Sequence, residues 1–150
     1  MKVFLGGTCA GTTWRNQLKP LLKIEYFDPV VEDWTPECQA EEERQKLFCP
    51  LRLYVITPEM KGVFSIAEAM NDSIKQNVGH TVTAILGSQV DWRESQFKSI
   101  NAFIDLARMS GAHIIASGYS YWTPLGSYKC GQLSDTEILE NTANYLNAAQ

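Results

Sequence analysis

Residues 51–70 read LRLYVITPEMKGVFSIAEAM, a stretch that predicts a buried strand, a short loop and a helix. Apart from Arg52, the run over residues 51–56 is apolar and β-branched and ends at a Thr-Pro pair, which is typical of an interior parallel strand. The next helix is expected to begin near Phe64, with Glu68 in its first turn. Glu68 would then stand just past the carboxyl end of the strand, where open α/β sheets bind ligands. A lone carboxylate there, among apolar and small neighbours, is a candidate nucleophile.

The same residues fit a second interpretation. Ser65 and Glu68 match the S-x-x-E capping box, in which the serine caps the helix and the glutamate accepts from the serine N–H. A capping glutamate folds onto its own helix end, whereas a nucleophile points into an open pocket. The sequence leaves both interpretations open.

Strand and helix patterns alternate along the rest of the chain. Strands are predicted over residues 2–5, 24–27, 81–86 and 113–117, and helices over residues 13–22, 36–48, 94–109 and 135–148. This order predicts one domain over residues 1–150, a flavodoxin-like or Rossmann-like three-layer sandwich of about five mostly parallel strands with helices on both faces. Residues 118–131 are irregular and rich in aromatics, and the sequence does not choose between a lid, a subunit contact and a long connection.

Composition excludes several classes of protein. The chain is 45% hydrophobic and 20% charged, as in ordinary globular proteins, and its net charge of −4 argues against a nucleic-acid partner. No apolar run is long enough to cross a membrane, and the amino-terminal apolar run is too short for a signal peptide. The four cysteines form no C-x-x-C pair, so we expect no metal site, reduced thiols and a cytoplasmic location. No organic cofactor is expected either.

The loop over residues 6–15 should meet Glu68 at the carboxyl edge of the sheet. Its glycines let the backbone approach a ligand, the following helix start favours an anion or polar oxygen, and Trp14 offers a stacking face. The loop lacks the spacing of a dinucleotide or triphosphate site. A tight turn alone explains the glycines, but not the adjacent Trp14 and Arg15.

Two further loops lead to the same edge. In the loop over residues 28–35, Asp33 beside Trp34 suits a heterocyclic base, through stacking and hydrogen bonding, although Asp33 as a simple turn residue is equally compatible. The loop over residues 59–65 leads to Glu68. The acidic run over residues 41–43 is most simply a solvated helix face, yet one of its acids could turn inward as a partner of Glu68.

Several of these segments together resemble a known family. KVFLGGT, TTWRNQL, PVVEDWTPEC, EEERQK and LYVITPEMKGVFSIAEA are similar to the nucleoside 2-deoxyribosyltransferases, in their shorter and less characterised branch, over about the first half of the chain. The resemblance implies that Glu68 attacks the anomeric carbon of a 2′-deoxynucleoside and releases the base. A covalent deoxyribosyl intermediate then waits for another base or for water.

The resemblance implies further roles. Glu42 matches the acid that steadies the site, and a one-residue alignment error would move this role to Glu43. Gly62 stands where better-known members carry an aspartate, so either Asp33 supplies the proton, or the substrate differs, or activity is reduced. Asn101 matches the asparagine that completes the site of a neighbouring subunit, and a homodimer or higher homo-oligomer is expected. The substrate-binding residues assigned in this way are Gly7, Thr8, Thr12, Trp14, Arg15, Trp34, Gly62, Ser65 and Asn101.

The expected function is transfer of 2-deoxyribose between free nucleobases, in nucleoside salvage, by double displacement through Glu68. The helix N-terminus is expected to keep this carboxylate ionised. One alternative is an N-glycosidase that uses water, with a 5′-monophosphate held by Thr8, Thr12 and Arg15. The other is a non-catalytic module that binds a nucleoside or nucleotide.

Overall fold

A parallel sheet forms the centre of the protein. The computed structural model describes residues 1–9, 11–75, 79–118, 120–123, 126–129 and 131–149. Within these residues the main sheet has five strands, β1 (Lys2–Gly7), β2 (Glu25–Phe27), β3 (Leu51–Ile56), β4 (His80–Ile85) and β5 (His113–Ala116). Their order is β2-β1-β3-β4-β5 and every pairing is parallel. This is the flavodoxin-like order.

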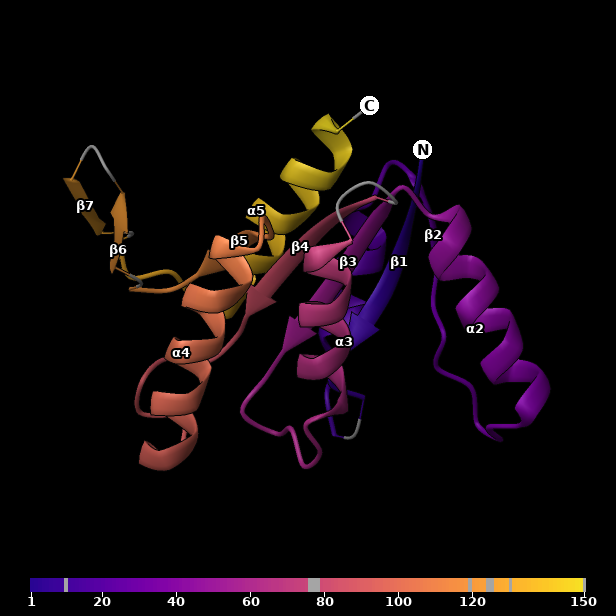
Figure 1. The fold of residues 1–150 in the computed structure, drawn as a ribbon, viewed down its shortest axis with the longest axis horizontal. Helices are drawn as coiled ribbons and strands as arrows, with labels where there is room; N and C mark the ends of the chain where they lie inside the picture. Colours follow the sequence, from indigo (N-terminus) through magenta and orange to yellow (C-terminus); the bar gives the residue numbers. More distant parts are fainter. Residues whose placement is uncertain (10, 76–78, 119, 124–125, 130, 150) are drawn as a thin grey trace.

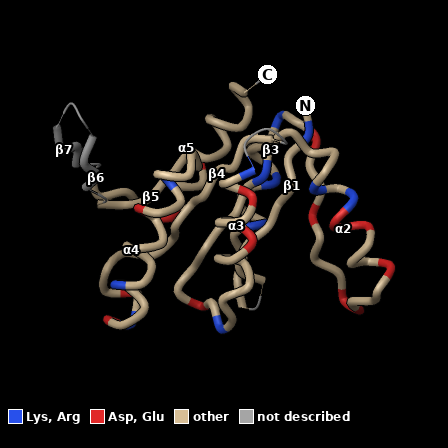
Figure 2. Tube along the Cα trace, in the orientation of Figure 1, with Lys and Arg blue, Asp and Glu red and all other residues tan. Residues whose placement is uncertain are grey.

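Helices cover both faces of the sheet, which gives three layers (Figure 1). The described helices are α1 (Trp14–Leu18), α2 (Pro36–Phe48), α3 (Phe64–Ile74), α4 (Glu94–Met109) and α5 (Asp135–Ala148). α1 and α5 pack on one face, whereas α3 and α4 pack on the other. α2 lies beside the β2 edge and carries much of the acidic charge of that side (Figure 2). The predicted fold class is confirmed, while the single domain over residues 1–150 stays a prediction. Among the described residues, no helix is long and apolar enough to span a membrane.

Two apolar clusters follow from the alternation of side chains along the strands. Val3 and Leu5 belong to the cluster under α1 and α5, and Phe4 between them belongs to the cluster under α3 and α4. All six residues of β3 are buried, as expected for an interior strand covered on both faces.

The carboxyl end of β1 requires glycine. Gly7 pairs with Val55 of β3 and has a φ of 120°, a conformation that residues with a side chain rarely adopt. A Cβ atom at Gly7 would lie 2.2 Å from the carbonyl oxygen of Val55. Thr8 then donates its N–H to the same carbonyl at 2.9 Å. β1 therefore ends close against β3, at the point where the order of the strands reverses.

Three local expectations differ from the structure. α1 ends at Leu18 and is followed by a 3₁₀ turn over Lys19–Leu21, because a proline enters at that turn. α3 begins at Phe64 as expected, but Glu68 is its fifth residue and so lies just past the first turn. The stretch over residues 118–131 contains an antiparallel pair, β6 (Ser120–Thr123) and β7 (Gly126–Lys129). Residues 119, 124, 125 and 130 lie outside the described part, and the role of this segment stays open.

Candidate active site

A cavity of about 360 Å³ opens at the carboxyl end of β1. It lies at the switch point of the sheet, where β1 neighbours β2 on one side and β3 on the other, the usual position of ligands in this topology. The walls come from the end of β1, the loop after β2, α2 and the first turns of α3. The lining residues are Gly6, Gly7, Cys9, Arg15, Pro29, Val30, Val31, Trp34, Glu42, Phe64, Ser65 and Glu68.

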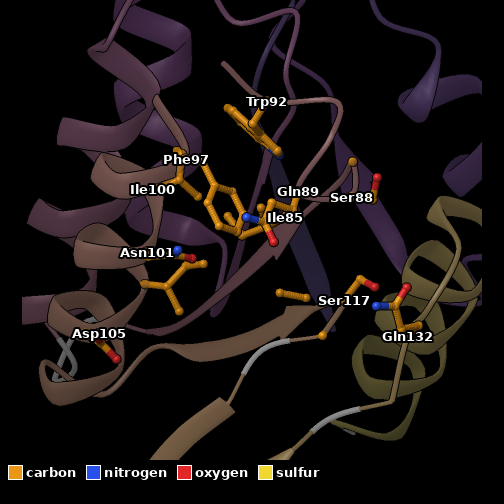
Figure 3. Close-up of a pocket in the computed structure, with 14 residues that line it drawn as sticks. Ile85, Ser88, Gln89, Trp92, Phe97, Ile100, Asn101, Asp105, Ser117 and Gln132 are labelled. Carbon is orange, nitrogen blue, oxygen red and sulfur yellow. The ribbon is translucent and has the colours of Figure 1, made fainter. Parts of the chain in front are cut away.

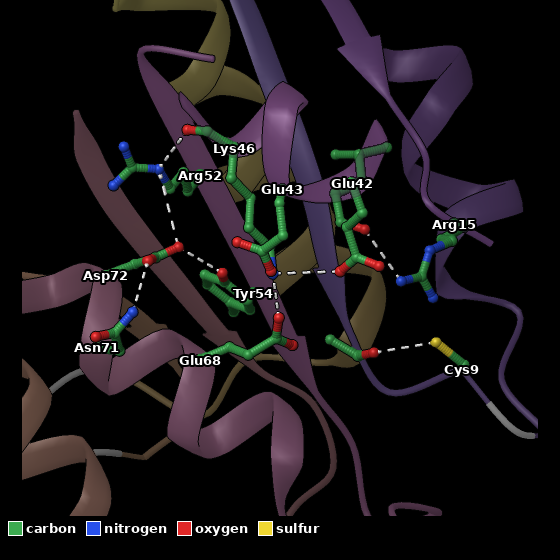
Figure 4. Close-up of polar contacts among 12 residues, drawn as sticks. Cys9, Arg15, Glu42, Glu43, Lys46, Arg52, Tyr54, Glu68, Asn71 and Asp72 are labelled. Atoms are coloured by element: carbon green, nitrogen blue, oxygen red, sulfur yellow. Dashed lines mark hydrogen bonds and ion pairs between the residues drawn. The ribbon is translucent and has the colours of Figure 1, made fainter. Parts of the chain in front are cut away.

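Two carboxylates from different helices face this cavity. Glu42 of α2 and Glu68 of α3 both line it, with side chains only 19% and 14% exposed. Lys46 lies between them: its Nζ donates to Oε1 of Glu68 and stands 3.3 Å from Oε1 of Glu42 (Figure 4). Glu43, whose side chain is 68% exposed, also reaches Nζ at 3.5 Å but does not line the cavity. The structure therefore places Glu42, and not Glu43, on the cavity wall.

The capping-box interpretation of Glu68 is wrong. α3 is capped by Val63, with no side-chain cap hydrogen bond, and Ser65 is the second residue of the helix. Within the described residues, the Glu68 carboxylate pairs with Lys46 and does not return to the Ser65 amide. The motif fails because α3 begins two residues earlier than a serine cap would require.

Burial dominates the electrostatics of Glu68. Loss of solvent raises the pKa of the Glu68 carboxyl, and the negative charges of Glu42 and Asp72 act in the same direction, while Lys46 opposes them. For Lys46, burial disfavours the charged form, but the contacts with the three glutamates outweigh it and raise the pKa of the ammonium. Among the groups that act on Glu68, Lys46 favours the carboxylate, and the expected contribution of the helix N-terminus stays a prediction.

Glu68 also lines a second cavity, of about 520 Å³, in the groove between α2 and α3. Lys46 and Glu43 line this second cavity but not the first one. Glu68 and Phe64 are the residues that both cavities share. Lys46 therefore reaches Glu68 from the α2 side, next to Glu42 and Glu43.

A buried polar cluster holds α3 against β3. The hydroxyl of Tyr54 donates to Oδ2 of Asp72 at 2.6 Å, and Nε of Arg52 lies 3.8 Å from the same oxygen. Burial and the Asp72 charge raise the pKa of Tyr54 strongly, so the phenol stays protonated as a donor. Asp72 follows Glu68 by one helical turn, so this cluster also fixes the orientation of the Glu68 side of α3.

In the loop over residues 6–15, the side chains of Trp14, Thr8 and Thr12 do not face the cavity as expected. Trp14 is 2% exposed in the core, donates to the Thr8 carbonyl at 2.9 Å and stacks against the Arg15 guanidinium at 4.1 Å. Its proposed stacking face for a base is therefore covered. The hydroxyl of Thr8 accepts the Thr57 N–H at 3.1 Å, and that of Thr12 donates to the Thr8 carbonyl at 3.1 Å. These hydroxyls fasten the loop rather than face the cavity.

Arg15 does line the cavity, but with a partner. Its Nε lies 3.1 Å from Oδ1 of Asp28, and its other nitrogens donate to the carbonyls of Thr8 and Leu5. The predicted phosphate site of Thr8, Thr12 and Arg15 is therefore not assembled in this structure.

The loops over residues 28–35 and 59–65 bring only some of their predicted site residues to the cavity. Trp34 lines the cavity and is 60% exposed, so its ring is available for stacking. Asp33 is exposed and lies outside the lining residues, although Val31 and Trp34 on either side of it belong to them. Gly62 lies in the loop before α3 with open space around its Cα, also outside the lining. The roles assigned to Asp33 and Gly62 stay predictions.

Comparison with known proteins supports the family suspected from the sequence. Residues 1–71 match the nucleoside 2-deoxyribosyltransferase-like family. The matched part runs from β1 into α3 and includes Glu42, Lys46 and Glu68. No curated protein and no solved structure gave a match.

Asn101 lies outside the matched residues and away from Glu68. It belongs to α4 and lines a third cavity, of about 400 Å³, beside the carboxyl ends of β4 and β5, together with Trp92, Phe97 and Gln132 (Figure 3). Within one chain it does not join the cavity of Glu68. Its role at the site of a neighbouring subunit stays a prediction.

Sequence reasoning missed Lys46. It follows the acidic run of α2, and its spacing to Glu42 indicates an ordinary i,i+4 pair. Its contact with Glu68, 22 residues away, depends on how α2 and α3 meet and has no local signal. Among the described residues, no cluster of three or more acidic, histidine or cysteine side chains is arranged to hold a metal ion.

Proposed function

We propose that this protein transfers 2-deoxyribose between nucleobases, with Glu68 as the nucleophile. The observation that carries the proposal is the pair of carboxylates, Glu42 and Glu68, on one cavity beside an exposed tryptophan. The family match over residues 1–71 supports the same reaction class. N-glycosidic cleavage passes through an oxocarbenium-like state, which nearby carboxylates stabilise.

The reaction proceeds in two displacements. A Glu68 oxygen forms a bond to the anomeric carbon as the C–N bond breaks, and the departing base takes up a proton on nitrogen. In the second displacement, a nitrogen of another base attacks the same carbon, loses its proton and frees the Glu68 carboxylate. Glu42 adds negative charge beside the positive sugar in both transition states. Asp33, next to Trp34 in the loop over the cavity, is the proposed donor of the proton.

The charges of the cavity favour an uncharged nucleoside over a 5′-monophosphate. Two acids line the cavity, and the guanidinium of Arg15 is paired with Asp28. The hydroxyls of Thr8 and Thr12 are engaged with backbone groups. Among the described residues that line the cavity, a phosphate would therefore meet negative charge and no unpaired cation. Trp34 would stack on the base.

The test is incubation of the purified protein with each 2′-deoxynucleoside and a different free base, followed by chromatography. Appearance of the exchanged nucleoside supports transfer, free sugar alone indicates the hydrolase, and binding without turnover indicates the non-catalytic module. Glu68→Gln should lower turnover by roughly 10⁴-fold or more. Glu59→Gln is the matched control, because this exposed acid follows β3 at the same edge of the sheet but outside the cavity.

Covalent capture tests the intermediate directly. A 2-fluoro-2-deoxynucleoside slows the release of the sugar, so mass spectrometry should find its adduct on a peptide that contains Glu68. An adduct on another residue, or a Glu68→Gln protein with full turnover, would falsify the assignment.

Glu42 and Glu43 form a second matched pair for the assay. Both lie within 3.5 Å of Lys46, but Glu42 lines the cavity and Glu43 does not. Glu42→Gln should lower kcat by about 10²–10³-fold, the usual cost of one electrostatic stabiliser. Glu43→Gln should stay within about twofold, as most exposed substitutions do. Equal losses in both variants would contradict the role of Glu42.

We also propose a homodimer or higher homo-oligomer, as the family resemblance implies. Light scattering tests this oligomeric state.

A further inference from the structure

Contacts hold both the backbone and the side chain of Lys46 in place. It lies in the last turn of α2, and its carbonyl accepts a hydrogen bond from the buried Nε of Arg52 at 3.1 Å. Its side chain is 11% exposed and passes Phe4, with Nζ 5.2 Å from the ring centroid. The ammonium therefore contacts Glu68 at the end of a side chain that has little freedom to move.

The ammonium binds Glu68, but Lys46 is not among the residues that line the proposed nucleoside cavity. Lys46 lines the groove between α2 and α3, whereas Trp34, Glu42 and the loop after β2 line the nucleoside cavity. It binds Oε1 of Glu68. A lysine placed in this way can hold the carboxylate without occupying the space that the sugar needs.

We propose that Lys46 is the positioning residue of Glu68: it fixes the carboxylate from the α2 side and keeps it ionised for attack on the sugar. The inference rests on the proposed function of Glu68 as the nucleophile. It explains how a largely buried acid can serve as an anionic nucleophile, since burial alone raises the pKa of Glu68 and Lys46 acts against this.

Several charged or titratable groups surround Glu68 and therefore affect its protonation. α2 contributes Glu42, Glu43 and Lys46; β3 contributes Arg52 and Tyr54; α3 contributes Asp72 and Lys75; and α1 contributes Arg15. Among the groups that act on the pKa of Glu68, Lys46 is the one that lowers it. Its removal should therefore leave the acids and the burial unopposed.

The test is a titration of the Glu68 carboxyl by ¹³C NMR in protein labelled at glutamate, with the signal assigned through Glu68→Gln. Lys46→Met keeps the length of the stem without charge and should increase the proton affinity of Glu68 by about tenfold or more. Lys46→Arg should restore the wild-type midpoint. Lys75→Met is the matched control, because Lys75, the C-cap residue of α3, lines the same groove but is exposed. A wild-type midpoint in Lys46→Met overturns the proposal.

Kinetics give a second readout that a merely structural lysine would not move. In Lys46→Met, the acid limb of the kcat profile should shift to higher pH together with the NMR midpoint, and kcat should fall more than KM changes. An unshifted limb overturns the proposal. If the wild-type protein cleaves no nucleoside, the proposed function fails, whereas the NMR titration still decides whether Lys46 controls Glu68.

A reciprocal measurement covers the case in which Lys46→Met does not fold. Because coupling between two sites is mutual, Glu68→Gln should lower the pKa of Lys46, measured from the ¹³C signal next to its ammonium. An unchanged Lys46 titration in Glu68→Gln contradicts the coupling and overturns the proposal.

Discussion

Loss of the buried Tyr54 hydroxyl should weaken the packing of α3 against β3. Tyr54 is fully buried, and its hydroxyl donates to Asp72 at 2.6 Å. Tyr54→Phe removes this donor and leaves no large void, so the effect isolates the hydrogen bond. A hydrogen bond to a charged group contributes about 1.5–3 kcal/mol. The free energy of unfolding should fall by that amount, which corresponds to a Tm lower by roughly 3–12 °C in a chain of this size.

The assay is urea unfolding followed by circular dichroism, with the m-value compared between variants. Tyr26→Phe is the matched control, since Tyr26 lies in β2 with 42% of its surface exposed, and its change should stay within about 0.5 kcal/mol. A double-mutant cycle with Asp72→Asn should give a coupling energy of about 0.5–3 kcal/mol. If Tyr54→Phe and Tyr26→Phe cost the same at an unchanged m-value, the cluster does not hold α3 in the way described.

Three shorter predictions concern the rest of the fold. Burial lowers the pKa of His113, so stability should fall as pH drops below about 6.5, and denaturation midpoints at several pH values should show a weaker fall in His113→Gln. Gly7→Ala should destabilise by more than about 1 kcal/mol in thermal unfolding, because its Cβ would meet the Val55 carbonyl at 2.2 Å. Ser134→Ala removes the cap that accepts from Glu137 and should cost about 1 kcal/mol in urea unfolding.

The fold was predictable wherever a local pattern had one meaning. An apolar run broken only by Arg52 gave β3 with its observed bounds, and the helix predicted over residues 36–48 has the bounds of α2. The helix predicted over residues 135–148 has the bounds of α5. The pair β6 and β7 was missed, because aromatic and polar residues in a short segment suit a loop as well as an edge strand.

The site was less predictable because its chemistry depends on contacts between distant elements. Glu68 was found from its position after β3, but the serine before it suggested a cap that the structure does not form. Trp14 looked like a stacking face, yet the amphipathic pattern of α1 turns it into the core. Lys46 gave no signal at all, because only the meeting of α2 with α3 brings it to Glu68.

Because Glu68 lines both the nucleoside cavity and the groove between α2 and α3, a small molecule could reach this residue from either of them. A small molecule with an acidic head that entered the groove between α2 and α3 would compete with Glu68 for Lys46. Such a compound would change the reactivity of Glu68 without occupying the nucleoside cavity. Inhibition of that kind would show as a fall in maximal velocity that extra nucleoside does not reverse.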